Sequence, residues 1–325
     1  KVLKEQECRV SVFVTTYNHE KYIRQCLDSM VSQKTDFPFE IIVRDDASTD
    51  STSDIVREYG EKYPGLVIPY ICEFNHHSRG MTNESFRTMF GMSHGKYIAS
   101  CEGDDFWTDP GKLQLQTDYM EAHPECTLCF TSSYYANPDG TIKEGQMFRT
   151  YTSSRDLTTE EVISEWVAPS NTLVYRRSSM EEDVIIPFRG ICVNEDYARI
   201  VYLAMKGTIH YIDQPTGAYR FGVPGSFSND TRTNPTAYKS RTLEFANMLD
   251  RMDEYYDRKY TKLIQREKAR QLFDMYANLE DKENMKKYLH GAYGESPFVW
   301  RILETIRTIA PKTMNRIKNL VRRNR

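Results

Sequence analysis

The stretch KYIASCEGDDFW, residues 96–107, decides the fold class because a short apolar run passes directly into a group of acids. The run has the length and composition of a buried strand. Glu102, Asp104 and Asp105 follow it, and Gly103 between them allows the backbone to approach a ligand closely. Adjacent carboxylates repel one another, whereas a hard divalent cation on phosphate oxygens would neutralise them. The structural alternative is an ordinary acidic turn that caps the next helix.

The chain around this stretch alternates short apolar runs with segments whose apolar residues recur at helical spacing. Such alternation indicates βαβ units and a mostly parallel sheet, whose ligands bind beyond the carboxyl ends of the strands. Asp45 and Asp46 follow the second expected strand, so two carboxylate sites at one sheet edge suggest a binding site. Strands are expected over 10–15, 40–44, 66–71 and 96–100, and helices over 20–33, from a cap at 50 or 51 through 59, over 83–92, and from Pro110 through 119.

The second half of the chain has a more mixed pattern. Strands are expected over 127–132, 172–175 and 208–212, with a helix over 195–205, and residues 236–290 are helix-forming throughout. We therefore expect an α/β domain over residues 1–230, a mixed, mostly parallel sheet flanked by helices. An α-helical C-terminal region over 231–325 follows it.

Composition excludes several classes of protein. The chain of 325 residues has 43 Lys and Arg against 46 Asp and Glu, so a global electrostatic match to nucleic acid is not expected. No apolar run reaches the roughly 18 residues of a membrane-spanning helix, and no signal peptide is visible. The seven cysteines are scattered, which favours a reducing cytoplasm. The chain starts at Lys1 rather than Met, so we expect that an N-terminal piece is missing.

Four motifs, in order, resemble family 2 glycosyltransferases of the GT-A fold. They are VTTYN at 14–18, DDASTD at 45–50, EGDD at 102–105 and NED at 194–196. The resemblance covers roughly residues 8–222, and FWTDP at 106–110 looks like bacterial surface-polysaccharide members.

The resemblance implies a Rossmann-like nucleotide-diphospho-sugar transferase. Its donor half would be about residues 8–125 and its acceptor half about 126–230. It would be a hexosyltransferase-type enzyme that inverts the sugar while moving it from a UDP-sugar or another nucleotide-sugar. The acceptor would be a glycan or lipid-linked molecule in capsule, exopolysaccharide or lipopolysaccharide synthesis.

The resemblance also assigns the donor site. Thr15 and Tyr17 would hold the nucleotide base, Tyr17 by stacking, and Asp46 would accept a hydrogen bond from the base. Arg79 lies in a loop that approaches the donor in relatives, beside His76 and His77. We expect these two histidines to be solvated loop residues, with donor contact as the alternative.

The acidic stretch stands where the family has its DxD motif. Glu102 takes the first position in place of the commoner Asp, and with Gly103 it would face the ribose or the metal shell. Asp104 would ligate Mn²⁺ or Mg²⁺ on the diphosphate, and Asp105 would be a second ligand or a partner of the first.

The acceptor side is assigned in the same way. Asp196 matches the catalytic base, which takes the proton from the acceptor hydroxyl, and Glu195 beside it would contact the acceptor. Without the other motifs, a helix start that favours acidic residues would be the preferred explanation of both. Trp107 would stack on an acceptor sugar or pack at the sheet edge. Arg220 would meet the diphosphate or acceptor, or be a buried salt-bridge partner; the His that many relatives carry beside it is absent.

The end of the chain, residues 301–325, is basic, and its apolar residues recur at helical spacing. Such helices lie on anionic membrane surfaces, which would suit a lipid-linked acceptor at the inner face of the plasma membrane. Packing on the domain or on a sister subunit is the alternative, and the oligomeric state stays open. Pro311 should break or kink this segment.

Two other functions are weighed against the transferase. A catalytically inactive scaffold of the same fold would have lost Asp104 or Asp196, and both are present. A sugar nucleotidyltransferase would show a Gly-rich loop with Arg and Lys after the first strand, where this chain has TTYN at 15–18. The pair Cys126 and Cys129 has no second pair to complete a zinc site.

Overall fold

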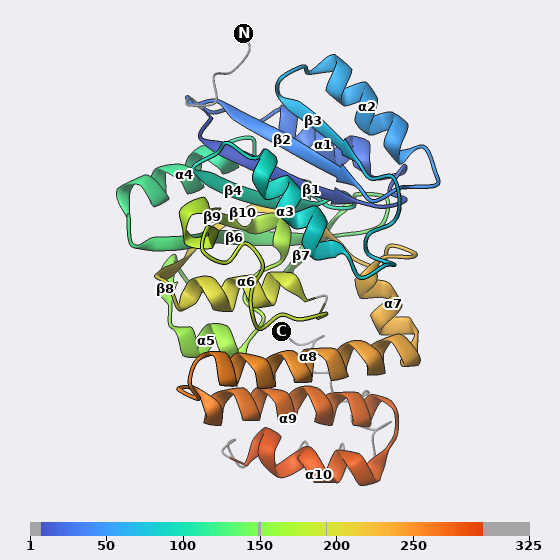
Figure 1. Cartoon of the computed structure of the whole chain (residues 1–325), viewed down its shortest axis with the longest axis vertical. Helices are drawn as coiled ribbons and strands as arrows, with labels where there is room; N and C mark the ends of the chain where they lie inside the picture. The colour runs from blue at the N-terminus through green and yellow to red at the C-terminus, as the bar shows by residue number, and fades with distance from the viewer. Residues whose placement is uncertain (1–7, 149–150, 193, 295–325) are drawn as a thin grey trace. The chain divides into compact units, whose positions relative to one another are not determined.

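The computed structural model describes residues 8–148, 151–192 and 194–294. Within these residues a ten-stranded sheet has the order β3-β2-β1-β4-β9-β6-β10-β5, with β7 beside β6 and β8 beside β10. Figure 1 shows the sheet with helices on its faces. The basic segment 301–325, with Pro311, lies outside the described residues, so its expected membrane role stays a prediction.

The first four strands are parallel to one another and form one side of the sheet. Three of them are buried along nearly their whole length, which is typical of a parallel sheet covered on both faces. The strands predicted here are confirmed to within two residues. They are β1 (Val10–Thr16), β2 (Phe39–Asp45), β3 (Val67–Ile71) and β4 (Tyr97–Glu102).

Helices cover both faces of this parallel part. Buried side chains of α1 (Ile23–Val31), α2 (Thr52–Lys62) and α4 (Lys112–Ala122) join one core with alternate residues of the strands. On the other face α3 (Thr82–Met92) places Phe86 against Phe13 of β1, with their rings 5.9 Å apart. The prediction that Pro110 opens α4 is wrong by two residues, because Gly111 is the N-cap and Pro110 lies in the preceding turn.

Beyond β4 the sheet is mixed. Strand β9 runs antiparallel to β4 and β6, whereas β10 runs parallel to β6 and antiparallel to β5. The remaining elements are β5 (Phe106–Trp107), β6 (Cys126–Ala136), β7 (Ile142–Met147), β8 (Arg155–Leu157), α5 (Thr159–Ser164), η1 (Ser170–Thr172), β9 (Val174–Arg176), η2 (Arg177–Met180), α6 (Glu195–Ala204) and β10 (Thr208–Arg220). The predicted strand over 208–212 thus continues to Arg220.

The chain divides into two compact units. The first runs to Ile186 and resumes over Asp196–Pro224, and the second takes Pro187–Glu195 and the chain from Gly225 onward. Nothing in the sequence pattern indicated that Pro187–Glu195 belongs with the helical unit. Its carbonyl groups at Phe188 and Arg189 accept hydrogen bonds from the Arg251 guanidinium, at 2.9 and 2.8 Å.

The second unit is helical, as predicted. Apolar side chains of α9 pack against α8 on one side and α10 on the other. Its helices are α7 (Phe227–Thr233), α8 (Pro235–Tyr255), α9 (Thr261–Asn278) and α10 (Lys282–Tyr293). In the described part of the chain, no helix combines the length and the apolar character needed to cross a bilayer.

Candidate functional site

The strand order places a topological switch point between β1 and β4. Strands β2 and β3 extend the sheet on one side of β1, and β4 returns to its other side. Ligands bind at such a switch point, beyond the carboxyl ends of the strands. Thr15 and Glu102 lie opposite each other there, and Thr16 lies opposite Asp45 on the other side. The acidic residues predicted at two strand ends therefore do lie at one edge.

Two hydroxyl groups hold Glu102 in place. Thr15 Oγ1 donates to one of its carboxylate oxygens, and Ser170 Oγ of η1 lies 3.4 Å from the other. The structure thus brings Thr15 and Glu102 together through a hydrogen bond between their own side chains. Ser170 was not predicted, because its partner is 68 residues away in the chain.

Gly103 lies against the end of β1. A Cβ atom at this position would be 2.7 Å from both Cβ and Oγ1 of Thr16 and 3.0 Å from His19 Nδ1. The backbone amide of Gly103 donates to the Thr15 carbonyl at 2.8 Å. Gly103 is therefore needed for close packing between β1 and the acidic loop, whereas we had expected it to serve the approach of a ligand.

Asp105 is buried, with 1% of its surface exposed. Its Oδ1 accepts a 2.7 Å hydrogen bond from the backbone amide of Arg220, and its Oδ2 has no hydrogen-bond partner among the described residues. Burial, and then the neighbouring Asp104 carboxylate, raise the pKa of Asp105 well above its usual value. Asp104 itself is half-buried, and its carboxylate makes no hydrogen bond within the described residues. These oxygens fit a hard divalent cation, which would compensate their charge.

Arg220 is the last residue of β10. It lies next to the acidic loop and is 2% exposed. Its guanidinium donates to the Asp104 carbonyl and to Gln25 Oε1, and lies 4.9 Å from the centre of the Tyr22 ring. Among the described residues no carboxylate pairs with this guanidinium, so the salt-bridge alternative is wrong. Arg220 instead fixes the backbone of the loop that carries Asp104. Gln25 was missed because it lies 195 residues from Arg220 in sequence.

Several buried polar atoms near this edge have no hydrogen-bond partner within the described structure. Buried polar groups are nearly always satisfied, so such a concentration needs a physical explanation. A polar ligand or a metal ion bound at this edge of the sheet would satisfy them. The atoms are Thr16 Oγ1, His19 Nδ1, Asp105 Oδ2 and Arg220 Nε.

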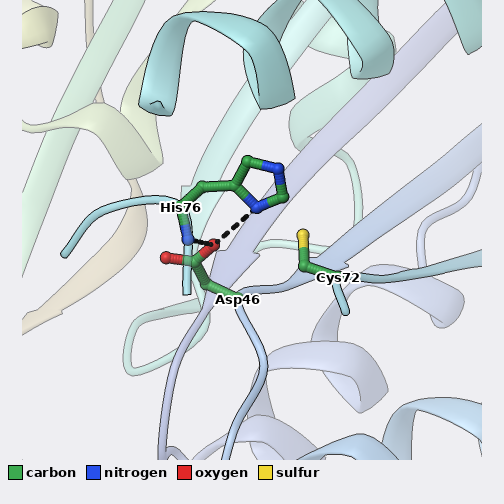
Figure 2. Close-up of side chains that lie close together, drawn as sticks. All are labelled: Asp46, Cys72 and His76. Atoms are coloured by element: carbon green, nitrogen blue, oxygen red, sulfur yellow. Dashed lines mark hydrogen bonds and ion pairs between the residues drawn. The ribbon is translucent and has the colours of Figure 1, made fainter. Parts of the chain in front are cut away.

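Asp46 lies at the end of β2 and is 1% exposed. Its two oxygens accept the backbone amides of His76 and His77, each at 3.0 Å, so the carboxylate anchors the loop after β3. Its predicted contact with a nucleotide base stays a prediction. His76 was expected to be solvated, but it is 9% exposed and faces Asp46 (Figure 2). His77 is exposed, as expected.

The aromatic and basic residues predicted around the donor and acceptor have different environments. Tyr17 is 43% exposed just beyond β1, where its ring is open to stacking. Arg79 is exposed, and its guanidinium lies 4.1 Å from the centre of the Phe74 ring. Trp107 is only 4% exposed, and its indole N–H donates to the Asn171 carbonyl at 2.9 Å. The Trp107 ring therefore packs in the core, and sugar stacking is not supported.

The two acidic residues of α6 are fixed by neighbours in sequence. Asp196 Oδ1 accepts the backbone amide of Tyr197 at 2.9 Å. Glu195 Oε2 lies 2.9 Å from Nη1 of the buried Arg189. Both residues begin a helix, which is the structural alternative stated above, and their predicted catalytic and acceptor roles stay predictions.

Comparisons with known proteins bear on this site. The family model described as Glycosyl transferase family 2 matches residues 11–183. An uncharacterized protein of Mycobacterium tuberculosis is 36% identical over 211 residues, which are 65% of this chain and 58% of that protein. The poly(ribitol-phosphate) beta-glucosyltransferase of Bacillus spizizenii is 34% identical over 123 residues, 37% of this chain and 18% of that enzyme. This chain thus spans well under two thirds of the length of both relatives.

A solved structure shares the fold. TarS residues 1–349 of S. aureus, crystallised with UDP-GlcNAc, superposes with a TM-score of 0.62 at 18% identity, covering 88% of this chain and 82% of that one. This similarity confirms the predicted GT-A architecture. The family model spans more than half of the chain and includes the acidic loop and both flanking strands. The protein therefore belongs to glycosyltransferase family 2.

Proposed function

We propose that this protein is a metal-dependent, inverting glycosyltransferase that transfers a sugar from a UDP-sugar to a glycan or lipid-linked acceptor of a bacterial surface polysaccharide. One observation carries the proposal: the acidic loop Glu102–Asp105 lies at the β1–β4 switch point, and a buried carboxylate oxygen of Asp105 has no hydrogen-bond partner among the described residues. The similarity to a poly(ribitol-phosphate) glucosyltransferase supports the class of acceptor.

Different residues of the first unit would contact different parts of the nucleotide-sugar donor. Thr15 and Tyr17 would hold the base, Tyr17 by stacking, and Asp46 would accept a hydrogen bond from it. Glu102 would face the ribose or the metal shell. Asp104, assisted by Asp105, would hold Mn²⁺ or Mg²⁺ on the diphosphate. Such an ion stabilises the negative charge that develops on the departing diphosphate.

Asp196 would act on the acceptor. It would take the proton from the acceptor hydroxyl as that oxygen attacks the anomeric carbon, a role that contributes typically about 10²–10⁴-fold to the rate. A single displacement of this kind inverts the anomeric configuration. UDP is the favoured nucleotide because the carboxylate that Asp46 resembles in the family typically accepts from uracil, and a carboxylate acceptor suits its N–H.

Donor binding is the first test. Thermal unfolding of the full chain is measured with UDP-, GDP-, TDP- and CMP-sugars, each with and without Mn²⁺. A ligand specific for the folded state adds about 2.7 kcal/mol of stability at a hundred times its dissociation constant. We expect Mn²⁺-dependent stabilisation by UDP-sugars, lost in Asp104→Asn and retained in Asp118→Asn, an exposed carboxylate on α4.

Turnover separates an enzyme from a scaffold. Slow donor hydrolysis without added acceptor, abolished in Asp196→Asn with donor binding intact, is the expected result. Folded protein that binds no nucleotide-sugar, or that binds one and never cleaves it with any acceptor, would favour the inactive scaffold. Retention of the anomeric configuration in the product would rule out the single displacement.

A further inference from the structure

Three side chains with metal-binding atoms meet between the ends of β2 and β3. Asp46 follows β2, Cys72 follows β3, and His76 lies in the loop after Cys72 (Figure 2). Their exposed fractions are 1%, 6% and 9%, and one potential ligand atom from each lies within 4.8 Å of the other two. None of the three belongs to the acidic loop at the β1–β4 switch point.

The spacing of Asp46 and His76 is that of two ligands of one ion. Asp46 Oδ1 and His76 Nδ1 are 3.5 Å apart, beyond the roughly 2.7–3.2 Å of an ordinary N–H···O bond. Nitrogen and oxygen ligands about 2.0–2.1 Å from a tetrahedral Zn²⁺ are about 3.4 Å apart. His76 Nδ1 is moreover buried without a hydrogen-bond partner among the described residues. An ion between these atoms would satisfy it.

The surroundings hold the side chains in this orientation. The backbone amides of His76 and His77 fix the two Asp46 oxygens, each of which keeps a further lone pair. The Asn75 side-chain amide donates to the Asp46 carbonyl at 3.1 Å. The Phe74 ring stacks on the His76 ring with centroids 4.7 Å apart. Partners of this kind orient the ligands of metal sites.

The types of ligand atom and their total charge indicate which metal ion would bind. Burial raises the pKa of the free Cys72 thiol, so a bound cation would displace its proton to solvent. The resulting thiolate and the carboxylate, with a neutral imidazole, would carry two negative charges, which balance a divalent cation in a buried site. Mixed nitrogen, sulfur and oxygen ligands are typical of Zn²⁺, whereas Mg²⁺ takes oxygen ligands alone. The nearby Arg44 guanidinium lies 3.9 Å from Asp46 Oδ2, the oxygen that does not face His76 Nδ1.

We propose that Asp46, Cys72 and His76 form a Zn²⁺ site, with a fourth coordination position for water or an exogenous ligand. The ion ties the loop after β3 to the end of β2. A consequence that rests on the proposed function is that Zn²⁺ weakens donor binding, because Asp46 is also the residue predicted to accept from the base. The site itself stands without that function.

Cobalt substitution tests the site in the full-length protein. Chelator-treated protein is titrated with Co²⁺, and we expect one equivalent to give a thiolate-to-cobalt charge-transfer band that one equivalent of Zn²⁺ removes. Cys72→Ser and His76→Gln should lose more than the roughly 10–100-fold in affinity that removal of an outer partner costs. The matched controls Cys8→Ser and His77→Gln should retain the band, since both wild-type residues lie outside the cluster.

A measurement on the wild-type protein keeps the proposal testable if the variants fail to fold. Zinc X-ray absorption should show one sulfur at about 2.3 Å and nitrogen or oxygen at about 2.0–2.1 Å. Absence of sulfur from that shell, no stoichiometric Zn²⁺ binding, or a cobalt band that survives Cys72→Ser would each overturn the proposal. Asp104→Asn distinguishes the metal site of the acidic loop from the Asp46–Cys72–His76 site. It should abolish Mn²⁺-dependent donor binding and leave the cobalt band unchanged.

Discussion

A side chain at position 103 has no room, because its Cβ would lie 2.7 Å from Cβ and Oγ1 of Thr16. Gly103→Ala must therefore push β1 and the acidic loop apart, at a cost of about 1–3 kcal/mol typical of overpacking. Urea unfolding measures the cost, and donor affinity should fall with it. Gly91→Ala is the control: its Cβ would meet nothing within 4 Å, and in a helix it should be neutral or slightly stabilising. Equal stability of both variants would contradict the packing argument.

Ala47 adopts a left-handed conformation, with φ at 59°, directly after Asp46. This region costs an L-residue about 1–2 kcal/mol, and glycine avoids that cost while losing about 0.5–1 kcal/mol in chain entropy. Ala47→Gly should therefore raise the free energy of unfolding by up to about 1 kcal/mol. Ala122→Gly, at the last residue of helix α4, should lower it. A loss of stability in Ala47→Gly would show that the left-handed backbone is not strained.

At the scale of elements, the loops after β1 and β2 are joined by reciprocal hydrogen bonds. The Asn18 backbone amide donates to Ser48 Oγ, and Asn18 Oδ1 accepts the Thr49 amide, both at 2.8 Å. Asn18 has φ at 54°. Asn18→Gly removes the two hydrogen bonds that Asn18 Oδ1 accepts from the Thr49 amide and hydroxyl, each worth about 0.5–1.5 kcal/mol. Asn18→Ala removes both and adds about 1–2 kcal/mol of backbone strain. Urea unfolding should rank wild type above Gly and Gly above Ala.

Donor affinity in the same two variants tests what the joined loops do. They carry Tyr17 and Asp46, so both variants should bind a nucleotide-sugar more weakly if these loops frame the base. Unchanged affinity in both would show that the junction serves stability alone. An Ala variant as stable as the Gly variant would contradict the strain at Asn18.

Elements with continuous apolar runs were predictable, and those with interruptions were not. Strands β1, β2 and β4 are buried runs that the sequence marks clearly. Strand β10 was predicted to stop at 212 because Asp213, Gln214 and Pro215 break its pattern. The strand instead passes through register shifts between Ile212 and Gly217, where an irregular ladder accommodates a proline.

The candidate site shows the same division. The carboxylates at the ends of β2 and β4 were found because parallel strands bring their carboxyl ends to one edge. The direction in which each side chain points was not accessible. Trp107 faces the core and His76 faces Asp46 because of partners far away in the sequence, Asn171 and the end of β2. Local pattern carries no information on such pairs.

At the scale of the whole molecule, a buried lysine sets a pH dependence of stability. Lys112 is fully buried, and burial lowers its pKa from 10.5 to about 7. Its ammonium group donates to Gln116 and to the Thr172 carbonyl at 3.1 Å. Between about pH 7 and 10.5 the unfolded chain binds a proton that the folded chain does not, so the Lys112 contribution to stability rises with pH.

The difference in unfolding free energy between wild type and Lys112→Met isolates this contribution. It should move in favour of wild type by at most about 1.4 kcal/mol per pH unit from pH 7 to 10. Urea unfolding at several pH values in this window measures it, and subtraction cancels groups that do not interact with Lys112, such as Tyr119, whose pKa is raised by burial. A difference independent of pH would mean that Lys112 keeps its proton in the fold.

The hydrogen bonds that hold Asp46 have a consequence for how this chain can diverge. Both donors are backbone amides, of His76 and His77, so substitution at either position leaves the anchor of the loop intact. An insertion or deletion between Cys72 and His76 would displace both amides at once. Homologous chains should therefore preserve the length of this loop while its side chains drift. A metal site that depends on His76 and Cys72 can then appear in one lineage and vanish in another without any rebuilding of the backbone.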